Sequence, residues 1–207
     1  MTSSVLNLPN ERRMVDVVRE GLSWANEASF AVSFTRCSGL GLLIDPLREL
    51  INRQGRVQLL TSTYMNVTQP EALTSLLHLQ GLDCFVQDGA TGFHSKFWLF
   101  GNANRGECWA GSSNLSKGGL AENLEWNLCS VHAAVIDQTR LQFHSLLQRS
   151  DVRRLSQSLI NEYSLRYARR ADLPLPMVAE RPGVPPPPNE AQREALQRLG
   201  DMREAGM

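Results

Sequence analysis

Apolar and polar residues alternate along the first 90 residues in patterns that predict helices and strands by turns. Apolar residues at helical spacing predict helices over residues 11–27, 40–53 and 70–79. Short apolar runs between them predict strands over residues 29–35, 56–61 and 82–87. Regular alternation of this kind predicts an α/β fold whose sheet has a parallel portion.

The pattern changes after Asp88, where helical spacing stops and strand-like segments follow one another closely. The predicted strands are residues 93–100, 107–110 and 124–131, with a hairpin loop over residues 101–106. Helical spacing returns over residues 134–148 and 155–170. The sequence therefore predicts an α/β fold in which helices flank a mixed β-sheet, with further helices toward the C-terminus.

The C-terminal part of the chain differs in composition from the rest. Residues 172–188 contain seven prolines, which is typical of an extended, semi-rigid linker. Residues 189–207 form a short amphipathic pattern that is too small to fold as a domain. The sequence thus predicts one domain over residues 1–171, a Pro-rich linker over 172–188 and a helical tail over 189–207.

Composition restricts the classes of partner. The net charge is zero, so any surface that binds phosphate must be local. No apolar run approaches the roughly 20 residues of a membrane helix, and the N-terminus does not resemble a secretory signal. We therefore expect a cytoplasmic protein with no membrane contact. Four widely spaced cysteines favour free, buried thiols over disulfides or a zinc site (Cys37, Cys84, Cys108 and Cys129).

Candidate chemistry concentrates between residues 94 and 127. Both lysines of the chain, Lys96 and Lys117, lie there, whereas the other 19 of its 21 basic residues are arginine. Lys96 follows His94 by two residues, which indicates a site that uses a compact ammonium group. Because side chains two apart on a strand point the same way, His94 and Lys96 should share a face. The same rule groups Asn123, Glu125 and Asn127, with Leu124, Trp126 and Leu128 packed behind them.

These residue types suit attack on a phosphodiester without a metal or cofactor. A neutral, oriented imidazole such as that of His94 is a competent nucleophile, and Glu125 is the candidate carboxylate to fix its tautomer. Lys96 and Asn114 would hold the phosphate oxygens on which charge develops. We predict these four residues as catalytic. The predicted substrate-binding residues are Ser112, Ser113, Lys117 and Asn123.

The leaving oxygen also needs a proton donor. His78 falls within a predicted helix, and His132 and His144 have no lysine nearby. A homodimer would solve the shortage, because one copy of His94 could attack while the other acts as the acid. The sequence therefore predicts a homodimer.

The ordered motif resembles that of the phospholipase D superfamily, which reads H-x-K, four residues, D, then G-S-x-N. His94, Lys96 and the 111–114 segment match it, but Gly101 stands where the aspartate would be. In the nuclease branch of that superfamily a downstream N-x-E replaces the aspartate, and Asn123 with Glu125 fits this. The resemblance implies a metal-independent phosphodiesterase with a phosphohistidine intermediate, whose two motifs meet at a dimer interface.

The resemblance extends to the phospholipase D-like domains that precede superfamily 2 DEAD/DEAH helicases. It is carried by residues 61–64, 69–73, 93–96 and 125–127, and by residues 188–196, which resemble the lead-in to a helicase core. This implies a DNA endonuclease in a bacterial restriction, defence or helicase-linked context, with a helicase module in cis or in trans as a partner.

Two other functions compete with a nuclease. The first is a catalytically degenerate module that binds nucleic acid or docks a helicase. The second is a lipid phosphodiesterase, which no membrane-seeking stretch supports. Trp98, Trp109 and Trp126 are expected in the core rather than as stacking platforms for bases, and residues 116–119 are expected to form a loop near the site. The arginines of residues 153–170 fit either a solvated helix face or contacts to a nucleic-acid backbone.

Overall fold

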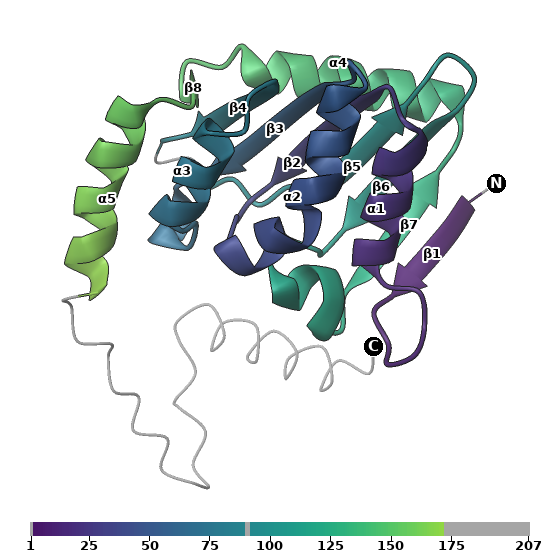
Figure 1. Ribbon diagram of the computed structural model, residues 1–207, viewed down its shortest axis with the longest axis horizontal. Helices are drawn as coiled ribbons and strands as arrows, with labels where there is room; N and C mark the ends of the chain where they lie inside the picture. Colours follow the sequence, from purple (N-terminus) through teal and green to yellow (C-terminus); the bar gives the residue numbers. More distant parts are fainter. Residues whose placement is uncertain (1, 90–91, 172–207) are drawn as a thin grey trace, which may run out of the picture. The chain divides into compact units, whose positions relative to one another are not determined.

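The computed structural model describes residues 2–89 and 92–171. The predicted linker (172–188) and tail (189–207) lie outside the described residues and stay predictions. Eight strands form one sheet in the order β1-β7-β6-β5-β2-β3-β4-β8 (Figure 1). Strands β2, β3 and β4 are parallel, and the other neighbouring pairs are antiparallel. The predicted mixed α/β sheet is confirmed.

The bounds of the predicted strands are close to those observed. The central strands are β2 (Glu27–Val32), β3 (Arg56–Ser62), β4 (Leu82–Gln87), β5 (Lys96–Gly101), β6 (Gly106–Gly111) and β7 (Trp126–Ser130). The predicted hairpin between β5 and β6 is confirmed by the pairing of Gly101 with Gly106. Two edge strands were not predicted, β1 (Thr2–Leu6) and β8 (Val152–Arg154).

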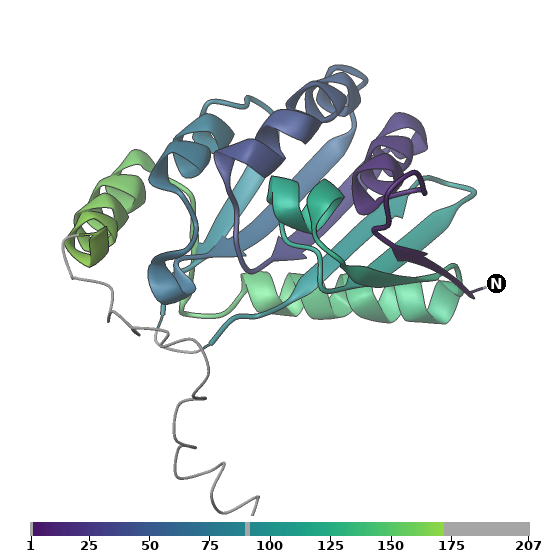
Figure 2. The same cartoon turned by 90° about the horizontal axis from the view of Figure 1, so that it is seen from below.

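Helices cover both faces of the sheet (Figure 2). The helices are α1 (Met14–Trp24), α2 (Cys37–Asn52), α3 (Pro70–Leu77), α4 (Ala133–Leu147) and α5 (Gln157–Ala171), all near their predicted positions. Figure 2 shows α4 along one face and α1, α2 and α3 along the other. Short helical turns occur at η1 (Tyr64–Asn66) and η2 (Gly118–Glu122), so the loop predicted over residues 116–119 leads into a π-helical turn.

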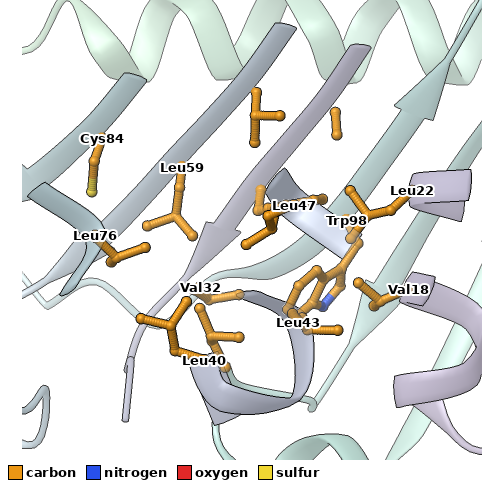
Figure 3. Packing of buried hydrophobic residues seen from close by; sticks show 14 of the residues in the cluster. Val18, Leu22, Val32, Leu40, Leu43, Leu47, Leu59, Leu76, Cys84 and Trp98 are labelled. Atoms are coloured by element: carbon orange, nitrogen blue, oxygen red, sulfur yellow. The ribbon is translucent and has the colours of Figure 1, made fainter. Parts of the chain in front are cut away.

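The main core lies between the sheet and helices α1 to α3. Leucines of α2 pack on inward-facing residues of the central strands, among them Leu59 and Trp98 (Figure 3). Burial of this apolar surface, at roughly 25 cal/mol per Å², is the main force that holds these helices on the sheet. Trp98 and Lys96 share one face of β5, so Lys96, the first residue of the strand, lies at the border of this core.

One prediction about the core is wrong. Trp98 and Trp109 are buried as expected, but Trp126 is 62% exposed. Leu124 and Leu128, predicted to pack behind the polar residues of β7, are also exposed. Odd- and even-numbered residues of β7 point to opposite faces, and the helix layer buries only Asn127 and Cys129. The other face of β7 therefore presents apolar side chains to solvent.

Two further findings concern composition. All four cysteines are free, and three are buried, but Cys37 is exposed, contrary to the prediction that all would be buried. Among the described residues, no helix combines the length and apolar character that crossing a membrane requires.

Candidate active site

His94 lies in the loop that enters β5, and Lys96 is the first residue of that strand. The Nζ atom of Lys96 is 2.9 Å from Nδ1 of His94 and donates a second hydrogen bond, also 2.9 Å, to the His94 carbonyl. Lys96 is only 8% exposed, whereas His94 is exposed. The two side chains therefore lie on the same side, as expected for residues two apart, with His94 in the irregular segment before β5 and Lys96 in the strand.

Two residues after β2 support this pair, and the sequence did not single them out. Ser33 Oγ accepts a hydrogen bond of 3.2 Å from Lys96 Nζ and donates to the Ser95 carbonyl. The Phe34 ring lies edge-on to the His94 ring, with centroids 5.9 Å apart, and Lys96 Nζ is also 5.9 Å from its centroid. Their position in the sequence could have indicated a role in the site, because they follow the carboxyl end of a parallel strand, where ligand sites of α/β sheets gather.

Gly111 ends β6, and the segment that follows it places Asn114 near this pair and the two serines against β7. Asn114 Oδ1 accepts a hydrogen bond of 3.1 Å from the Phe34 amide, which fixes Asn114 next to the aromatic neighbour of His94. Ser112 is exposed, and its Oγ accepts from the Trp126 amide. Ser113 is fully buried, and its Oγ accepts a 2.8 Å hydrogen bond from Asn127 Nδ2. Ser113 thus holds β6 to β7 and does not face solvent.

A side chain on Gly111 would not fit the site. An added Cβ would collide with the Trp126 carbonyl and come within 2.5 Å of Asn127 Oδ1. Asn127 is itself fully buried, and its Oδ1 has no hydrogen-bond partner among the described residues. The glycine of the motif is therefore explained by the close approach of two strands.

Glu125 enters the site through its charge on Lys96. Burial lowers the pKa of the Lys96 ammonium, and the Glu125 carboxylate raises it, offsetting part of that effect. Within the described residues no hydrogen bond joins Glu125 to His94, and Lys96 occupies Nδ1 instead. The Glu125 carbonyl accepts from the Asn7 amide, which extends the β1–β7 ladder to this corner.

The other predicted substrate-binding residues lie on the turn beyond Asn114. Lys117 is exposed and pairs with Glu122, with Nζ and Oε1 2.6 Å apart. Asn123 is exposed, and its amide donates to the Gly118 carbonyl. Across residues 2–89 and 92–171, no three His, Cys, Asp or Glu side chains gather as a metal site would require.

Solved structures resemble this one over most of its length. NucT from Helicobacter pylori is 18% identical with a TM-score of 0.57, covering 72% of this chain and 96% of its own. Nuc from Salmonella typhimurium, described as a phospholipase D family member, is 15% identical with a TM-score of 0.57, covering 74% and 98%. The fold is that of the phospholipase D superfamily. TrmBL2, described as an archaeal chromatin protein, is 15% identical with a TM-score of 0.50, covering 71% of this chain and 52% of its own.

Comparison of sequences finds no related protein, whereas comparison of structures does. Neither a protein-family profile nor a curated protein sequence matches the chain. The resemblance to the phospholipase D superfamily is therefore carried by the fold and by the motif residues.

The structure also locates Gly101, where the phospholipase D motif has its aspartate. Gly101 ends β5 and pairs with Glu27, so it lies five residues, or about 17 Å along the strand, from Lys96. A Cβ at Gly101 would lie 3.0 Å from Glu27 Oε1, and Glu27 forms an ion pair with Arg140. A carboxylate at position 101 would therefore not reach His94.

Proposed function

We propose that this protein is a metal-independent phosphodiesterase that cleaves DNA, with His94 as the nucleophile and Lys96, Asn114 and Glu125 as the other catalytic residues. One observation carries the proposal: a nearly buried ammonium group contacts an exposed imidazole at 2.9 Å. Burying a charge is unfavourable unless it has partners. A cation kept in this position beside an accessible nucleophile suits the binding of an anion such as a phosphodiester.

The contact between Lys96 and His94 implies how the reaction begins. An ammonium group only donates, so Nδ1 of His94 accepts, and the proton of the neutral ring is on Nε2. Attack by Nδ1 requires Lys96 to leave it, and attack by Nε2 requires the ring proton to move to Nδ1. In either case the phosphate must draw Lys96 away from the imidazole. If Nε2 attacks, the ring proton is on Nδ1, and Glu125 is the carboxylate proposed to accept a hydrogen bond from it.

The reaction has two steps. An imidazole nitrogen of His94 bonds to phosphorus while the bond between phosphorus and the leaving sugar oxygen breaks. That oxygen takes a proton from His94 of a second copy, which acts as an imidazolium and becomes a neutral imidazole. Water then attacks the phosphohistidine, gives its proton to that second imidazole, and the P–N bond breaks. Lys96 and Asn114 hold the phosphate oxygens in both transition states.

The homodimer that this mechanism needs is supported by the exposed apolar face of β7. Leu124, Trp126 and Leu128 are 72%, 62% and 56% exposed, close to the segment that carries Ser112. Contiguous exposed apolar surface is typical of protein contacts. A solution mass of twice the 23.1 kDa of one chain is the expected result, measured by sedimentation.

The test is cleavage of DNA oligonucleotides in the presence of EDTA. We expect His94→Ala to lower the rate by at least about 1000-fold, because the covalent step is lost. His78→Ala, at the exposed C-terminal end of α3, is the matched control and should cleave as the parent does. A phosphorylated His94 peptide from a stopped reaction would identify the intermediate. A parent protein that cleaves no DNA would contradict the proposal.

A DNA-binding module without catalysis is the second candidate. The fold is shared with TrmBL2, whose structure is described as showing a novel mode of DNA binding. DNA binding by the parent protein, with no cleavage of single or double strands, would favour this candidate. The helicase-linked defence context and the cytoplasmic location remain parts of the proposal, supported by the resemblance of residues 61–64 and 188–196.

A further inference from the structure

A hollow lies at the carboxyl ends of β3 and β4, and its walls do not include the predicted site residues. It has a volume of about 450 Å³, within the range of sites that hold small molecules. Its walls include Thr63, Tyr64, Met65, Asn66, Asp88 and Arg166. We call this hollow the Tyr64 pocket.

The Tyr64 pocket adjoins the candidate active site. A Cβ added to Gly92 would lie 3.5 Å from Cζ of Tyr64, and Gly92 is two residues before His94. Two Cα steps span at most about 7.6 Å, so the backbone of His94 begins close to the wall of the pocket. Hydrogen bonds connect them as well: the Tyr64 amide donates to Ser62 Oγ, and Ser62 Oγ donates to the Ser33 carbonyl.

The backbone of the pocket wall is strained. Met65 and Asn66 have φ angles of 57° and 50°, a left-handed conformation that asparagine tolerates but that costs methionine about 1–3 kcal/mol. The Met65 side chain is 56% exposed, so burial of that side chain does not compensate the cost. Such strain is typical of binding sites, where the conformation serves a ligand.

Charges at the base of the pocket hold one arginine in place. The Asp88 side chain is 7% exposed, and its Oδ1 accepts from Thr63 Oγ1 at 2.7 Å and from Arg166 at 2.5 Å. Its Oδ2 accepts from Arg153 at 3.5 Å. Because a guanidinium has five N–H donors and Arg166 is about half exposed, Arg166 keeps donors for a ligand. Of the arginines predicted for one helix face, Arg153 lies on β8 and Arg166 on α5, and both are paired with Asp88.

We propose that the Tyr64 pocket binds one base of a single-stranded nucleic acid whose neighbouring phosphate lies at His94. Tyr64 offers an aromatic ring for stacking, and Met65 adds an apolar wall. Asn66 and Arg166 can form hydrogen bonds with the edge of a base. A base can enter only when it is unpaired and unstacked, which selects single strands. This inference rests on the proposed function, because it names the substrate of the same site.

The experiment uses a fluorescent single-stranded DNA oligonucleotide of about 12 nucleotides, sufficient for a site of this kind. Binding is measured with His94→Ala protein, and cleavage with the otherwise unchanged chain. We expect Tyr64→Ala and Met65→Gly to weaken binding and to raise KM about tenfold, with kcat nearly unchanged. Met65→Gly should be at least as thermally stable as the parent, because glycine tolerates this φ angle. Leu141→Ala, on exposed α4, is the control and should change neither binding nor KM.

The outcomes separate this inference from the proposed function. Cleavage whose KM does not respond to Tyr64→Ala or Met65→Gly would overturn the pocket and leave the phosphodiesterase standing. Tyr64-dependent binding of single strands by a parent protein that does not cleave would support the pocket and overturn the catalytic proposal. Equal affinity for the oligonucleotide and its fully paired duplex would overturn the selection of single strands.

Discussion

The two ends of β5 differ in a way that separates chemistry from architecture. At the first end, Lys96 is nearly buried and contacts His94 and Ser33. At the other end, Gly101 pairs with Glu27, whose carboxylate forms an ion pair with Arg140 of α4. Trp98 and Phe100, both buried, fill the strand face between them. One sequence motif can therefore span two places in the fold, one that carries the candidate chemistry and one that contributes to stability.

The charged side chains at the two ends of β5 also differ in their exposure to water. Lys96 is 8% exposed, so its charge is poorly hydrated and remains available to an incoming anion. Glu27 and Arg140 have side chains that are 44% and 34% exposed, and water screens their attraction. Changes at the Lys96 end should therefore affect catalysis strongly, and changes at the Gly101 end should affect mainly stability, and weakly.

Among substitutions at the two ends of β5, the largest effect is expected from Lys96→Met. The substitution removes the cation that would hold the phosphate, so the rate of DNA cleavage should fall at least about 100-fold. Folding should not suffer equally, because an apolar side chain can replace a buried charge at little cost. Arg48→Met, which removes an exposed arginine of α2, is the control and should leave cleavage unchanged. Full activity in Lys96→Met would contradict the role of this end of β5.

The same variant should change how stability depends on pH. Burial lowers the pKa of Lys96 in the folded protein below its ordinary value of 10.5. Between the two pKa values the unfolded chain binds more protons, so the free energy of unfolding contributed by Lys96 rises with pH. Urea unfolding across that alkaline window should show this rise in the parent, and Lys96→Met should lack it.

At the opposite end, Glu27→Gln is expected to cost up to about 1 kcal/mol of stability, as is typical of partly exposed ion pairs. Cleavage should remain at the parent's rate, because position 27 pairs with Gly101 and lies far from His94. A double-mutant cycle with Arg140→Gln, measured by urea unfolding, isolates the pair from the second partner of Arg140, Asp137. A large loss of cleavage at unchanged stability would show that the two ends are coupled.

The central elements could be predicted because their apolar patterns are strong and local. Strand β3 is almost wholly buried, and α3 begins at Pro70, which suits the first turn of a helix. Strand β1 was missed because residues 2–6 carry little apolar periodicity, and the strand exists through pairing with β7, 120 or more positions away. Pairing between distant segments leaves no local signal.

The residues of the site could be predicted from their types and order, but their contacts could not. Alternation predicts a shared face for His94 and Lys96 but not the contact of Lys96 Nζ with Nδ1, and the support from Ser33 and Phe34 comes from the segment that follows the neighbouring strand. The burial expected of Trp126 was wrong because alternation gives the two faces of β7 but not which one a helix covers. In the described residues, α4 packs beside Cys108 of β6 and leaves Trp126 exposed.

The smallest effect is expected from Gly101→Asp, which restores the motif aspartate. The new carboxylate would lie beside that of Glu27, with Arg140 3.4 Å from the added Cβ, so repulsion and attraction largely cancel. We expect a loss of stability below about 1 kcal/mol and an unchanged cleavage rate, because about 17 Å of strand separates position 101 from Lys96. Gly41→Asp, which adds the same carboxylate at an open position of α2, is the control. Since Glu27→Gln removes the repulsion, Gly101→Asp should cost less in that background. A faster parent reaction in Gly101→Asp would mean that the far end of β5 acts on the site, and the separation of chemistry from architecture would fail.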